Sequence, residues 1–519
     1  MKIVSTQQIR DLDRAAIEAY KVPGSLLMER AGRGVAAGVI RLIKEHGLDG
    51  KAVLLAAGRG NNGGDAFVAA RYLSEEGFKV SLLLAGDRKS LRGDALFHFK
   101  KMLRAGICAE ELSAESDWRE LSGEGLSGSV VVDGILGTGL EGKARGAAAA
   151  AIRFINALAR KNLAVAIDVP SGINSDTGRA EGDVVRADLT LTMGLPKRGL
   201  IEQSALEYVG QLQVVDIGFP NELVTQVKAD LELIAPEDVA LLFPPRPRIA
   251  HKGSYGHLLI MGGAEGYSGA MTLAAMGALR SGPGLVSVAV PERLAPAIAL
   301  AVPEAMVHGE RETGSGSLHS SCWAKWKKRL PNFSAILAGP GMTRHAETGR
   351  LVKMILRDSR IPVVLDADAL NIFEGRAALL AKRECPLVIT PHPGEMARLL
   401  ALSTARVQAR RMRTAKQSAR LTNATVVLKG AGTLVAEKGR LQINLTGNPG
   451  MASGGMGDVL AGLAGGFLAQ GLKPFDAARA SVYLHGRAGD MAAASSSESS
   501  LMARDLIACL PGAFREFRR

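Results

Sequence analysis

Short apolar runs between helical stretches constrain the fold of this chain more than any other feature. Examples are KAVLLAA, SVVVDGIL and LAVAIDVPSG in the first half, and IPVVLDADALN and CPLVITPHPGE in the second. Other stretches, such as SLLMERAGRGVAAGVIRLI, are apolar at helical spacing. Continuous apolar strands separated by helices are typical of a parallel sheet that is covered on both faces. We therefore predict an α/β protein with doubly wound sheets.

The length of the chain indicates two domains. It has 519 residues, whereas single hydrophobic cores stop growing near ~250–300 residues. The strand and helix alternation breaks near residues 221–250, where the chain is rich in proline and arginine. We predict a first domain over 1–221 and a second over 228–519, with the linker near 222–230.

The formal net charge of +13 is read as a solvated basic surface, with attraction of phosphorylated ligands as the alternative. Nucleic-acid binding is not expected, because aromatic residues make up only 4% of the chain and bases stack on aromatic side chains. The basic run ARVQARRMRTAKQSAR contains none and is interpreted as the exposed face of a helix.

Neither a membrane protein nor a secreted one is expected. No apolar run reaches the ~20 residues that span a bilayer, and the charged start MKIVSTQQIRDLDRAAIEAY lacks the apolar core of a signal peptide. The four cysteines lie far apart and form no CxxC pair, which favours a reducing compartment. We expect a cytoplasmic protein that forms a homo-oligomer.

The loop GRGNNGGDAF follows an apolar run and contains the spacing Gly58-x-Gly60-x-x-Gly63. Such glycines let the backbone approach a phosphate at a helix N-terminus, as in dinucleotide-binding turns. Asp87 lies roughly where such a turn has its ribose ligand, so hydride transfer is one interpretation. The asparagines and the aspartate inside the loop exceed what a dinucleotide turn requires.

Polar residues also follow two further apolar runs. Asp133 ends one run and precedes the loop 137–143, and Asp168 and Ser171 follow another. Each carboxylate taken alone is read as the cap of a turn, but strand ends of a parallel sheet converge on one crevice. Asn62, Asp133 and Ser171 offer oxygen ligands with one negative charge, which suits K⁺ better than zinc and leaves Asp168 as the acid/base.

The strings GRGNNGGDAF, VDGILGTGL, AIDVPSGINSDTG and GLPKRG, in this order, resemble the epimerase domain of the NAD(P)H-hydrate repair enzymes. The resemblance covers nearly all of 1–220 and implies a Rossmann-like domain that acts on NADH or NADPH hydrated across one ring double bond. It implies K⁺ at Asn62, Asp133 and Ser171, and proton transfer by Asp168. It also places the substrate on Asp168 and on two loops made of Asn61, Asn62, Gly63, Gly64, Asp65, Gly137, Thr138, Gly139, Leu140, Glu141, Gly142 and Lys143.

The segment NPGMASGGMGDVLAG carries the strongest motif of the second half. Gly454, Gly455 and Gly457 open a helix whose backbone N–H groups form an anion hole. Asp458 follows in the first turn, placed to take a proton from a hydroxyl that attacks a phosphate. The ending of a Walker A loop is missing. Lys429 to Thr433, in VVLKGAGT, form a second candidate phosphate loop.

Structural alternatives exist for each of these residues. His392 lies between prolines and is a candidate rigid turn, and Glu395 is expected to begin a helix, since carboxylates favour a first turn. Lys429 is a candidate solvated strand end and Asp458 a candidate first-turn acid. For Asp458 we favour the functional interpretation, because the glycines before it have no packing use.

The second half resembles the ribokinase-like family and, within it, the ADP-dependent NAD(P)H-hydrate dehydratases. The strings that carry the resemblance are AHKGSYGHLLIMGGAEGYSGA, DADALN, TPHPGEM, LKGAGT and GNPGMASGGMGDVLAG. It implies that Asp458 is the base and that the hydrated cofactor lies on Ala270, Gly341, His392 and Asp458. It implies ADP with Mg²⁺, the nucleotide being bound by Lys429, Gly430, Ala431, Gly432, Thr433 and Gly457.

The sequence therefore predicts a bifunctional repair enzyme, an isomerase and a lyase. The first domain is expected to interconvert the (R) and (S) hydrates of NADH and NADPH, and the second to dehydrate the (S) hydrate with ADP. The alternative is a small-molecule kinase of the ribokinase-like class with a non-catalytic nucleotide-binding first domain.

Overall fold

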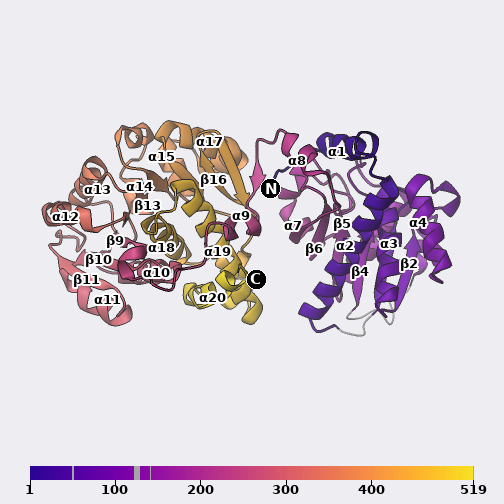
Figure 1. The fold of residues 1–519 in the computed structure, drawn as a ribbon, viewed down its shortest axis with the longest axis horizontal. Coiled ribbons are helices and arrows are strands. Elements are labelled where there is room, and N and C mark those ends of the chain that lie inside the picture. The colour runs from indigo at the N-terminus through magenta and orange to yellow at the C-terminus, as the bar shows by residue number, and fades with distance from the viewer. Residues whose placement is uncertain (49–51, 122–128, 141, 518–519) are drawn as a thin grey trace. The chain divides into compact units, whose positions relative to one another are not determined.

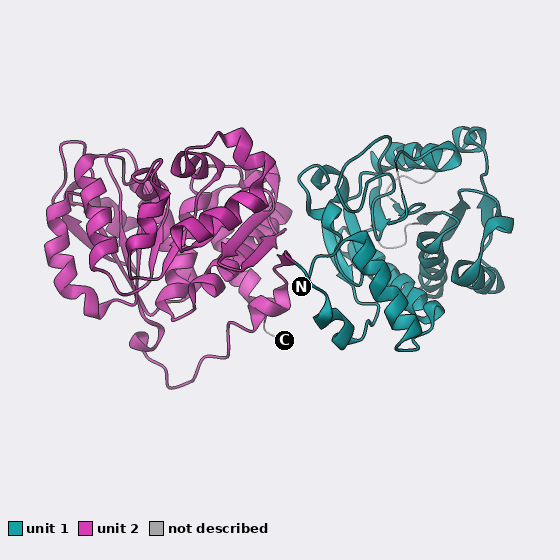
Figure 2. Cartoon of the chain, turned by 90° about the horizontal axis from the view of Figure 1, so that it is seen from above, with its two compact units in different colours: residues 1–229 teal, residues 230–519 magenta. Residues whose placement is uncertain are grey.

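The computed structural model describes residues 1–48, 52–121, 129–140 and 142–517. The chain folds into two compact units, Met1–Ala229 and Asp230–Arg519, which Figure 2 shows in teal and magenta. The predicted limits of the epimerase domain (1–221) and of the dehydratase domain (228–519) remain predictions.

In the described part of the first unit, seven parallel strands form one sheet in the order β3-β2-β1-β4-β5-β6-β7. This is the order of a Rossmann-like sheet, whose ligand crevice lies at the carboxyl ends of the central strands, where the order reverses. Here those strands are β1 and β4. The strands are β1 Val53–Ala57, β2 Val80–Leu84, β3 Ala109–Glu111, β4 Val130–Gly134, β5 Leu163–Ile167, β6 Leu189–Met193 and β7 Gln211–Val215.

Helices cover both faces of this sheet, and Figure 1 shows α2 and α3 side by side over one of them. The helices are α1 Thr6–Glu18, α2 Gly24–Glu45, α3 Asn61–Glu75, α4 Gly93–Arg104, α5 Glu115–Glu120, α6 Gly146–Ala159, α7 Leu206–Val209 and α8 Asn221–Gln226. Val53, Leu55 and Ala57 of β1 join the core with α2, α3 and α4, whereas Leu54 and Ala56 join the core with α5 and α6. Successive strand residues point to opposite faces, so a strand covered on both faces is apolar throughout.

In the described part of the second unit, ten strands form one sheet in the order β11-β10-β9-β12-β13-β14-β15-β16-β17-β8. The pairs are parallel except that β16 runs antiparallel to β15 and β17. The strands are β8 Glu232–Leu233, β9 His257–Met261, β10 Leu285–Pro291, β11 Met306–Glu310, β12 Ala335–Ala338, β13 Val363–Leu365, β14 Leu387–Ile389, β15 Thr425–Leu428, β16 Thr433–Glu437 and β17 Arg440–Asn444.

The main core of the second unit lies between this sheet and α10, α18, α19 and α20. Leu258, Leu337, Val364 and Val388 contribute to it from neighbouring strands. The helices of the unit are α9 Pro236–Ala240, α10 Ser268–Ser281, α11 Ala295–Ala301, α12 Trp323–Arg329, α13 Ala346–Asp358, α14 Asp368–Asn371, α15 Pro393–Leu400, α16 Thr404–Ala409, α17 Arg411–Thr422, α18 Met456–Ala469, α19 Pro474–Ser495 and α20 Ala503–Arg515.

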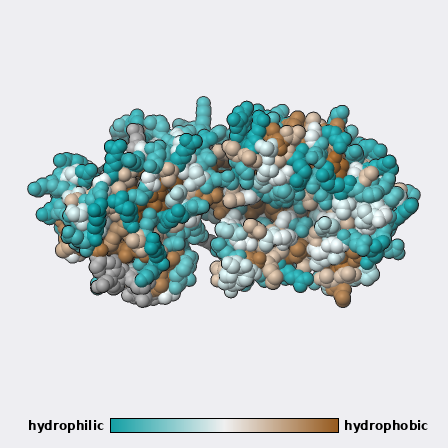
Figure 3. Space-filling view, turned by 180° about the vertical axis from the view of Figure 1, so that it is seen from behind, coloured by the Kyte–Doolittle hydropathy of each residue, from teal (hydrophilic) through white to brown (hydrophobic). Residues whose placement is uncertain are grey.

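The predicted fold class, α/β with two doubly wound sheets, is confirmed. Hydrophilic and apolar residues are interspersed on the face that Figure 3 shows. Of the helices within the described residues, none combines the length and apolar character that crossing a membrane requires.

Candidate functional site

The glycine loop after β1 is held by close backbone contacts. A Cβ atom at Gly63 would lie 1.8 Å from the carbonyl oxygen of Gly58, and one at Gly58 would lie 1.9 Å from that of Ile135. Only glycine fits at both positions, so the loop packs tightly against the loop after β4. Asn61 begins α3 and is exposed, whereas Asp65 is buried one turn later. Asp87 caps the short 3-10 helix Arg88–Ser90 through Lys89 N and is exposed, so the cap accounts for this acid without a ribose.

The three residues predicted to bind K⁺ meet at the ends of β1, β4 and β5. Asn62 Nδ2 donates to the carbonyl oxygens of Leu136 (3.0 Å) and Ile167 (2.9 Å), which leaves its Oδ1 available. Asp133 accepts from Ser171 Oγ at 2.6 Å and from Ser171 N at 2.8 Å. Asp133 and Ser171 are fully buried.

This donor set fits a potassium ion. Burial raises the pKa of Asp133 to about 6, a rise that hydrogen bonds from Ser171 only partly offset. Among the described residues no cationic side chain pairs with this carboxylate. A bound cation would stabilise the charged form of this carboxylate, and amide, carboxylate, hydroxyl and carbonyl oxygens suit a hard ion.

Asp168 follows β5 and forms an ion pair with a buried lysine. Its backbone lies in the left-handed region, with φ of 64°, where a residue other than glycine is strained and points to a functional constraint. Its Oδ1 accepts from Met193 N (3.0 Å), from Thr192 Oγ1 (3.2 Å) and from Lys197 Nζ. Lys197 is only 1% exposed, and its ammonium also donates to Thr192 Oγ1 and Met193 O.

Two further carboxyl groups lie close enough to this pair for their charges to interact. Burial raises the pKa of Asp65 well above its usual value, and the charges of Asp168 and Asp13 add to the rise. Burial also raises the pKa of Asp13 to about 6, with Lys197 lowering it and Asp168 raising it. The site thus holds three carboxyl groups and one ammonium, an arrangement suited to proton transfer.

The loop predicted to hold the substrate lies beside this cluster. Gly137 packs against the side chain of Asn62, and Thr138 O accepts a hydrogen bond from Arg10 at 3.2 Å. Gly139, Gly142 and Lys143 are exposed and Leu140 is half-buried. Glu141 lies outside the described residues. Arg10 and Asp13 on α1, and Lys197, were not among the residues predicted from sequence.

In the second unit, four charged residues meet where β13, β14 and β15 end and α18 begins. Lys429 Nζ donates to Asp366 Oδ1 at 2.9 Å and lies 3.8 Å from Glu395 Oε2. Asp458 lies in the first turn of α18, and its charge acts on Lys429. A Cβ at Gly457 would lie 3.2 Å from Lys429 Nζ. The ammonium therefore sits at the helix N-terminus, and Lys429 is not the solvated strand end considered above.

The protonation of this cluster follows from its burial. Burial raises the pKa of Asp458 to about 7, with Asp366 and Glu395 adding to the rise and Lys429 opposing it. Burial alone would lower the pKa of Lys429, but the carboxylates of Asp366 and Glu395 raise it overall. A carboxyl that titrates near neutral pH is suited to general base catalysis.

The loop Lys429 to Thr433 is held by a hydrogen bond within the loop and by a buried arginine of α17. Thr433 Oγ1 donates to Gly430 O at 2.8 Å, and Ala431 at its tip is exposed. The guanidinium of Arg411 donates to the carbonyl oxygens of Leu428, Lys429 and Gly432 at 3.2–3.3 Å. Arg411 is buried, so the interpretation of its basic run as an exposed helix face is wrong at this position. The buried face of α17 carries the arginine because these carbonyl groups need donors.

His392 and Glu395 form a capping box at the start of α15. Glu395 Oε2 accepts from His392 N at 2.7 Å, and His392 Nδ1 accepts from Gly394 N at 3.0 Å. Glu395 therefore begins a helix, as expected, and also faces Lys429. Burial lowers the pKa of His392, with Lys429 adding to the effect, which favours the neutral imidazole. The ring remains half exposed beside the cluster.

Ala270 and Gly341 lie next to each other, although they belong to α10 and to the loop after β12. A Cβ at Gly341 would lie 3.4 Å from that of Ala270 and 2.9 Å from Tyr267 O. The glycine loop before α18 is fixed by α19, since Asp490 accepts from Gly447 N (2.9 Å) and Asn448 Nδ2 (3.1 Å). These loops all lie at carboxyl ends of strands, where parallel sheets bind ligands.

The donor set for Mg²⁺ is incomplete without phosphates. In the described residues no group of three or more His, Cys, Asp or Glu side chains is arranged to hold a metal ion. Asp366, Glu395 and Asp458 nevertheless supply carboxylates beside the glycine loop before α18. This fits Mg²⁺, which is usually held by one or two carboxylates together with substrate phosphates and water.

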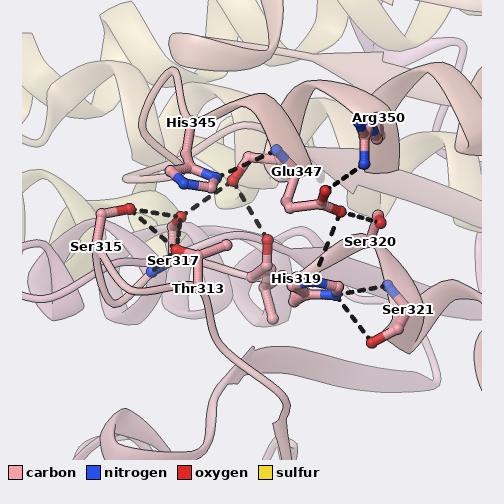
Figure 4. Close-up of polar contacts among 11 residues, drawn as sticks. Thr313, Ser315, Ser317, His319, Ser320, Ser321, His345, Glu347 and Arg350 are labelled. Carbon is pink, nitrogen blue, oxygen red and sulfur yellow. Dashed lines mark hydrogen bonds and ion pairs between the residues drawn. The ribbon is translucent and has the colours of Figure 1, made fainter.

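A cluster of polar side chains lies near the start of α13 (Figure 4). Thr313 and Ser317 bond to each other at 2.9 Å, and Ser317 bonds to Thr348 at 3.0 Å. His319 Nδ1 lies 2.9 Å from Ser321 Oγ, but His319 Nε2 lies 3.7 Å from Glu347 Oε2, which is too long for a hydrogen bond. The residue types of a hydrolytic triad are therefore present without its geometry.

Both units match known protein families. A family model described as YjeF-related protein N-terminus matches residues 24–199, and one described as NAD(P)H-hydrate dehydratase matches residues 258–511. The bifunctional NAD(P)H-hydrate repair enzyme Nnr of Moorella thermoacetica is 40% identical over 516 residues, which are 99% of this chain and 97% of the relative. The enzyme of the same name from Escherichia coli is 36% identical over 506 residues, covering 96% and 92%.

A solved structure matches the second half. The ADP/ATP-dependent NAD(P)H-hydrate dehydratase of Bacillus subtilis, co-crystallised with ATP and Mg²⁺, has a TM-score of 0.50 and 32% identity, over 56% of this chain and 100% of that chain. Relatives above 30% identity align along nearly the whole chain, and both halves match their family models. The chain belongs to the family of bifunctional NAD(P)H-hydrate repair enzymes.

Proposed function

We propose that this chain repairs hydrated NADH and NADPH with one reaction in each unit. The first unit interconverts the (R) and (S) hydrates, and the second dehydrates the (S) hydrate to NAD(P)H at the expense of ADP. The observation that carries the proposal is a carboxyl beside a lysine at the carboxyl ends of the strands in each unit. These pairs are Asp168 with the buried Lys197 and Asp458 with the half-buried Lys429. Family membership supplies the substrate class.

In the first unit, Asp168 is proposed to exchange the proton of the ring hydroxyl. When the hydroxyl leaves as water, the lone pair of the ring nitrogen forms a C=N bond, and water returning to the other face reverses these changes. The loops Asn61 to Asp65 and Gly137 to Lys143 are proposed to hold the substrate. Asn62, Asp133 and Ser171 would hold K⁺, which supplies a fixed positive charge to the crevice.

In the second unit, Asp458 is proposed to take the proton of the ring hydroxyl as its oxygen attacks the terminal phosphorus of ADP. AMP leaves with the bonding pair, and the ring carries phosphate, a better leaving group than hydroxide. Phosphate then departs as the ring nitrogen donates its lone pair, and loss of a ring proton restores the double bond. Lys429 and the backbone N–H groups of the glycine loop before α18 stabilise the charge on the phosphates.

The remaining site residues are assigned from the family resemblance. Ala270, Gly341 and His392 are proposed to contact the hydrated ring, and Lys429 to Thr433 with Gly457 to bind ADP with Mg²⁺. The crystals of the Bacillus subtilis relative were grown with ATP and Mg²⁺, which supports a nucleotide with a magnesium ion here. We also propose that the chain is cytoplasmic and forms a homo-oligomer, and sedimentation of the purified chain would test the oligomeric state.

The proposed function is tested with separated (R) and (S) hydrates of NADH, with and without ADP, while the absorbance of NADH is followed. We expect the (S) hydrate to give NADH only with nucleotide, and the (R) hydrate to give it after epimerisation. A stable phosphorylated product without NADH would instead indicate a small-molecule kinase.

Potassium is expected to stabilise the first unit. A ligand that binds only the folded state stabilises it by ~2.7 kcal/mol at 100 times its Kd. Raising KCl at constant ionic strength, with choline chloride as the balance, should therefore raise the melting temperature of the first unit. Asp133→Asn should remove the KCl dependence, whereas Asp87→Asn, at the exposed cap, should keep it. Equal melting curves in both salts would argue against the cation.

Arg411 is expected to act on nucleotide affinity through the loop that it supports. Removing its guanidinium takes a donor from the buried carbonyl group of Leu428 and from the part-buried ones of Lys429 and Gly432, which costs ~1–3 kcal/mol of stability. Arg411→Met should raise the KM for ADP by about tenfold, with a smaller change in kcat. Arg413→Met changes an exposed arginine of the same helix and should leave both constants as they are. An unchanged KM for ADP in Arg411→Met would contradict this role.

A further inference from the structure

Helix α1 is fixed to the segments that follow β5 and β6, where Asp168 and Lys197 lie. Val4 N donates to Pro196 O at 3.0 Å, and Arg198 N donates to Val4 O at 2.9 Å. Thr6 N donates to Asp176 Oδ1 at 2.7 Å. The beginning of α1 is therefore tied to the backbone on both sides of Lys197, and its position relative to the acid/base pair is defined.

Two charged residues of α1 face the site of the first unit. Arg10 and Asp13 are three residues apart, which places them on one side of a helix. Arg10 reaches the loop carbonyl of Thr138, and Asp13 lies where Lys197 and Asp168 act on its charge. Asp65, from α3, completes the charged groups that face it.

The carboxyl of Asp13 is free for a ligand. It is half-buried, and none of the hydrogen bonds or ion pairs between described residues engages it. By contrast, Oδ1 of Asp168 accepts three hydrogen bonds, and all three ammonium donors of Lys197 are used by the protein. No described residue donates to the carboxyl of Asp65 either, but that residue is buried. Asp13 is therefore the carboxyl of this group that is both unbonded and partly open to a ligand.

We propose that Asp13 is a second catalytic residue of the epimerase site, exchanging protons with the ring oxygen on the face opposite Asp168. The inference rests on the proposed function of the first unit. Epimerisation moves oxygen from one ring face to the other, so one fixed carboxylate reaches only one of the two oxygen positions. A pair of carboxyls with different environments divides the acid and base roles.

In one direction of the reaction Asp13 acts as the acid and Asp168 as the base. Protonated Asp13 gives its proton to the ring hydroxyl, the C–O bond breaks, water leaves, and the nitrogen lone pair forms C=N. On the other face a water oxygen bonds to the same carbon, the C=N pair returns to nitrogen, and Asp168 accepts the proton of that water. The reverse direction exchanges the two roles, and the protons return through solvent. Burial raises the pKa of Asp13 to about 6, so both of its protonation states are accessible near neutral pH.

Asp13→Asn in the full chain tests the inference. Its kcat for (R) to (S) epimerisation should fall by on the order of 10²–10⁴-fold, with KM within about threefold. The limb of the kcat/KM pH profile with an apparent pKa near 6 should disappear, and Asp13→Glu should recover part of kcat. Asp11→Asn changes an exposed aspartate of the same helix and should behave as the parent chain.

Dehydration of the (S) hydrate by the second unit serves as the internal control. If the parent chain epimerises and Asp13→Asn matches its kcat and pH profile, the inference is overturned while the proposed function stands. A rise in KM alone, with kcat kept, would also overturn it, since Asp13 would then only bind substrate. If the parent chain dehydrates the (S) hydrate but does not epimerise, the function of the first unit fails and the inference falls with it.

Discussion

Asp458→Asn is expected to lower the rate of ADP-dependent dehydration by on the order of 10²–10⁴-fold, because the amide cannot accept the hydroxyl proton. The side chain keeps nearly the same size, so the KM for ADP should change little. Epimerisation of the (R) hydrate should continue at the parental rate. The measurement is NADH formation from the (S) hydrate and, separately, the appearance of (S) from (R).

The same substitution is expected to stabilise the second unit at alkaline pH. The pKa of Asp458 rises from 3.8 to about 7 on folding, so the native state binds this proton more tightly than the unfolded chain. The stability that the protonated carboxyl provides is lost as pH rises from 3.8 through about 7. At pH 8 the variant should therefore melt higher than the parent, by ~2–4 °C for each kcal/mol that the charged carboxyl costs, and at pH 4 the two should melt alike.

Asp476→Asn is the matched control, since Asp476 lies in the first turn of the following helix, α19. It should lose only a few tenths of a kcal/mol in helix stability and none of the activity. If Asp458→Asn dehydrates the (S) hydrate as fast as Asp476→Asn, Asp458 is only a first-turn acid. The pH dependence of the parent provides a second check, because kcat/KM should fall about tenfold per pH unit below pH 7.

The fold could be predicted because a strand that is buried on both faces has apolar residues at every position. Val53 to Ala57 are apolar at every position since both faces of β1 are covered, and such runs mark the central strands of a parallel sheet. Asn62, Asp133 and Ser171 could be grouped because they follow strands of a parallel sheet, whose carboxyl ends lie on the same side of the sheet. The structure does bring these three side chains together.

The partners that complete each site could not be predicted in this way. Asp366 and Lys429 are 63 positions apart, and nothing in either segment indicates the other. For Arg411, the sequence around it does indicate that the residue is buried. The buried positions of α17 follow helical spacing, with Thr414, Ala415, Ser418 and Ala419 on one face, and Arg411 lies on that face. A charged residue inside a buried stripe indicates a buried polar contact. Asp13, four residues after Ile9 in α1, lies beside such a stripe as well, but its contact is the proposed ligand and not a protein group.

Asp168→Asn is expected to abolish epimerisation and also to destabilise the first unit. Asparagine tolerates the left-handed backbone of position 168, so the strain is not increased. The amide, however, leaves the ammonium of Lys197, only 1% exposed, without its counter-ion. Removing one partner of a buried pair costs ~3–5 kcal/mol. We therefore expect a large loss of melting temperature together with a loss of kcat, so this single variant cannot separate catalysis from folding.

The double variant Asp168→Asn with Lys197→Met separates the two effects. Without the ammonium no unpaired charge is buried, and methionine retains most of the apolar stem, so most of the lost stability should return. Epimerisation should stay as low as in Asp168→Asn, since the proton acceptor is still missing. Melting curves and (R) to (S) rates of the parent, both single variants and the double variant form a complete cycle. Recovery of activity along with stability would show that Asp168 acts only by pairing with Lys197, and would remove it from the chemistry.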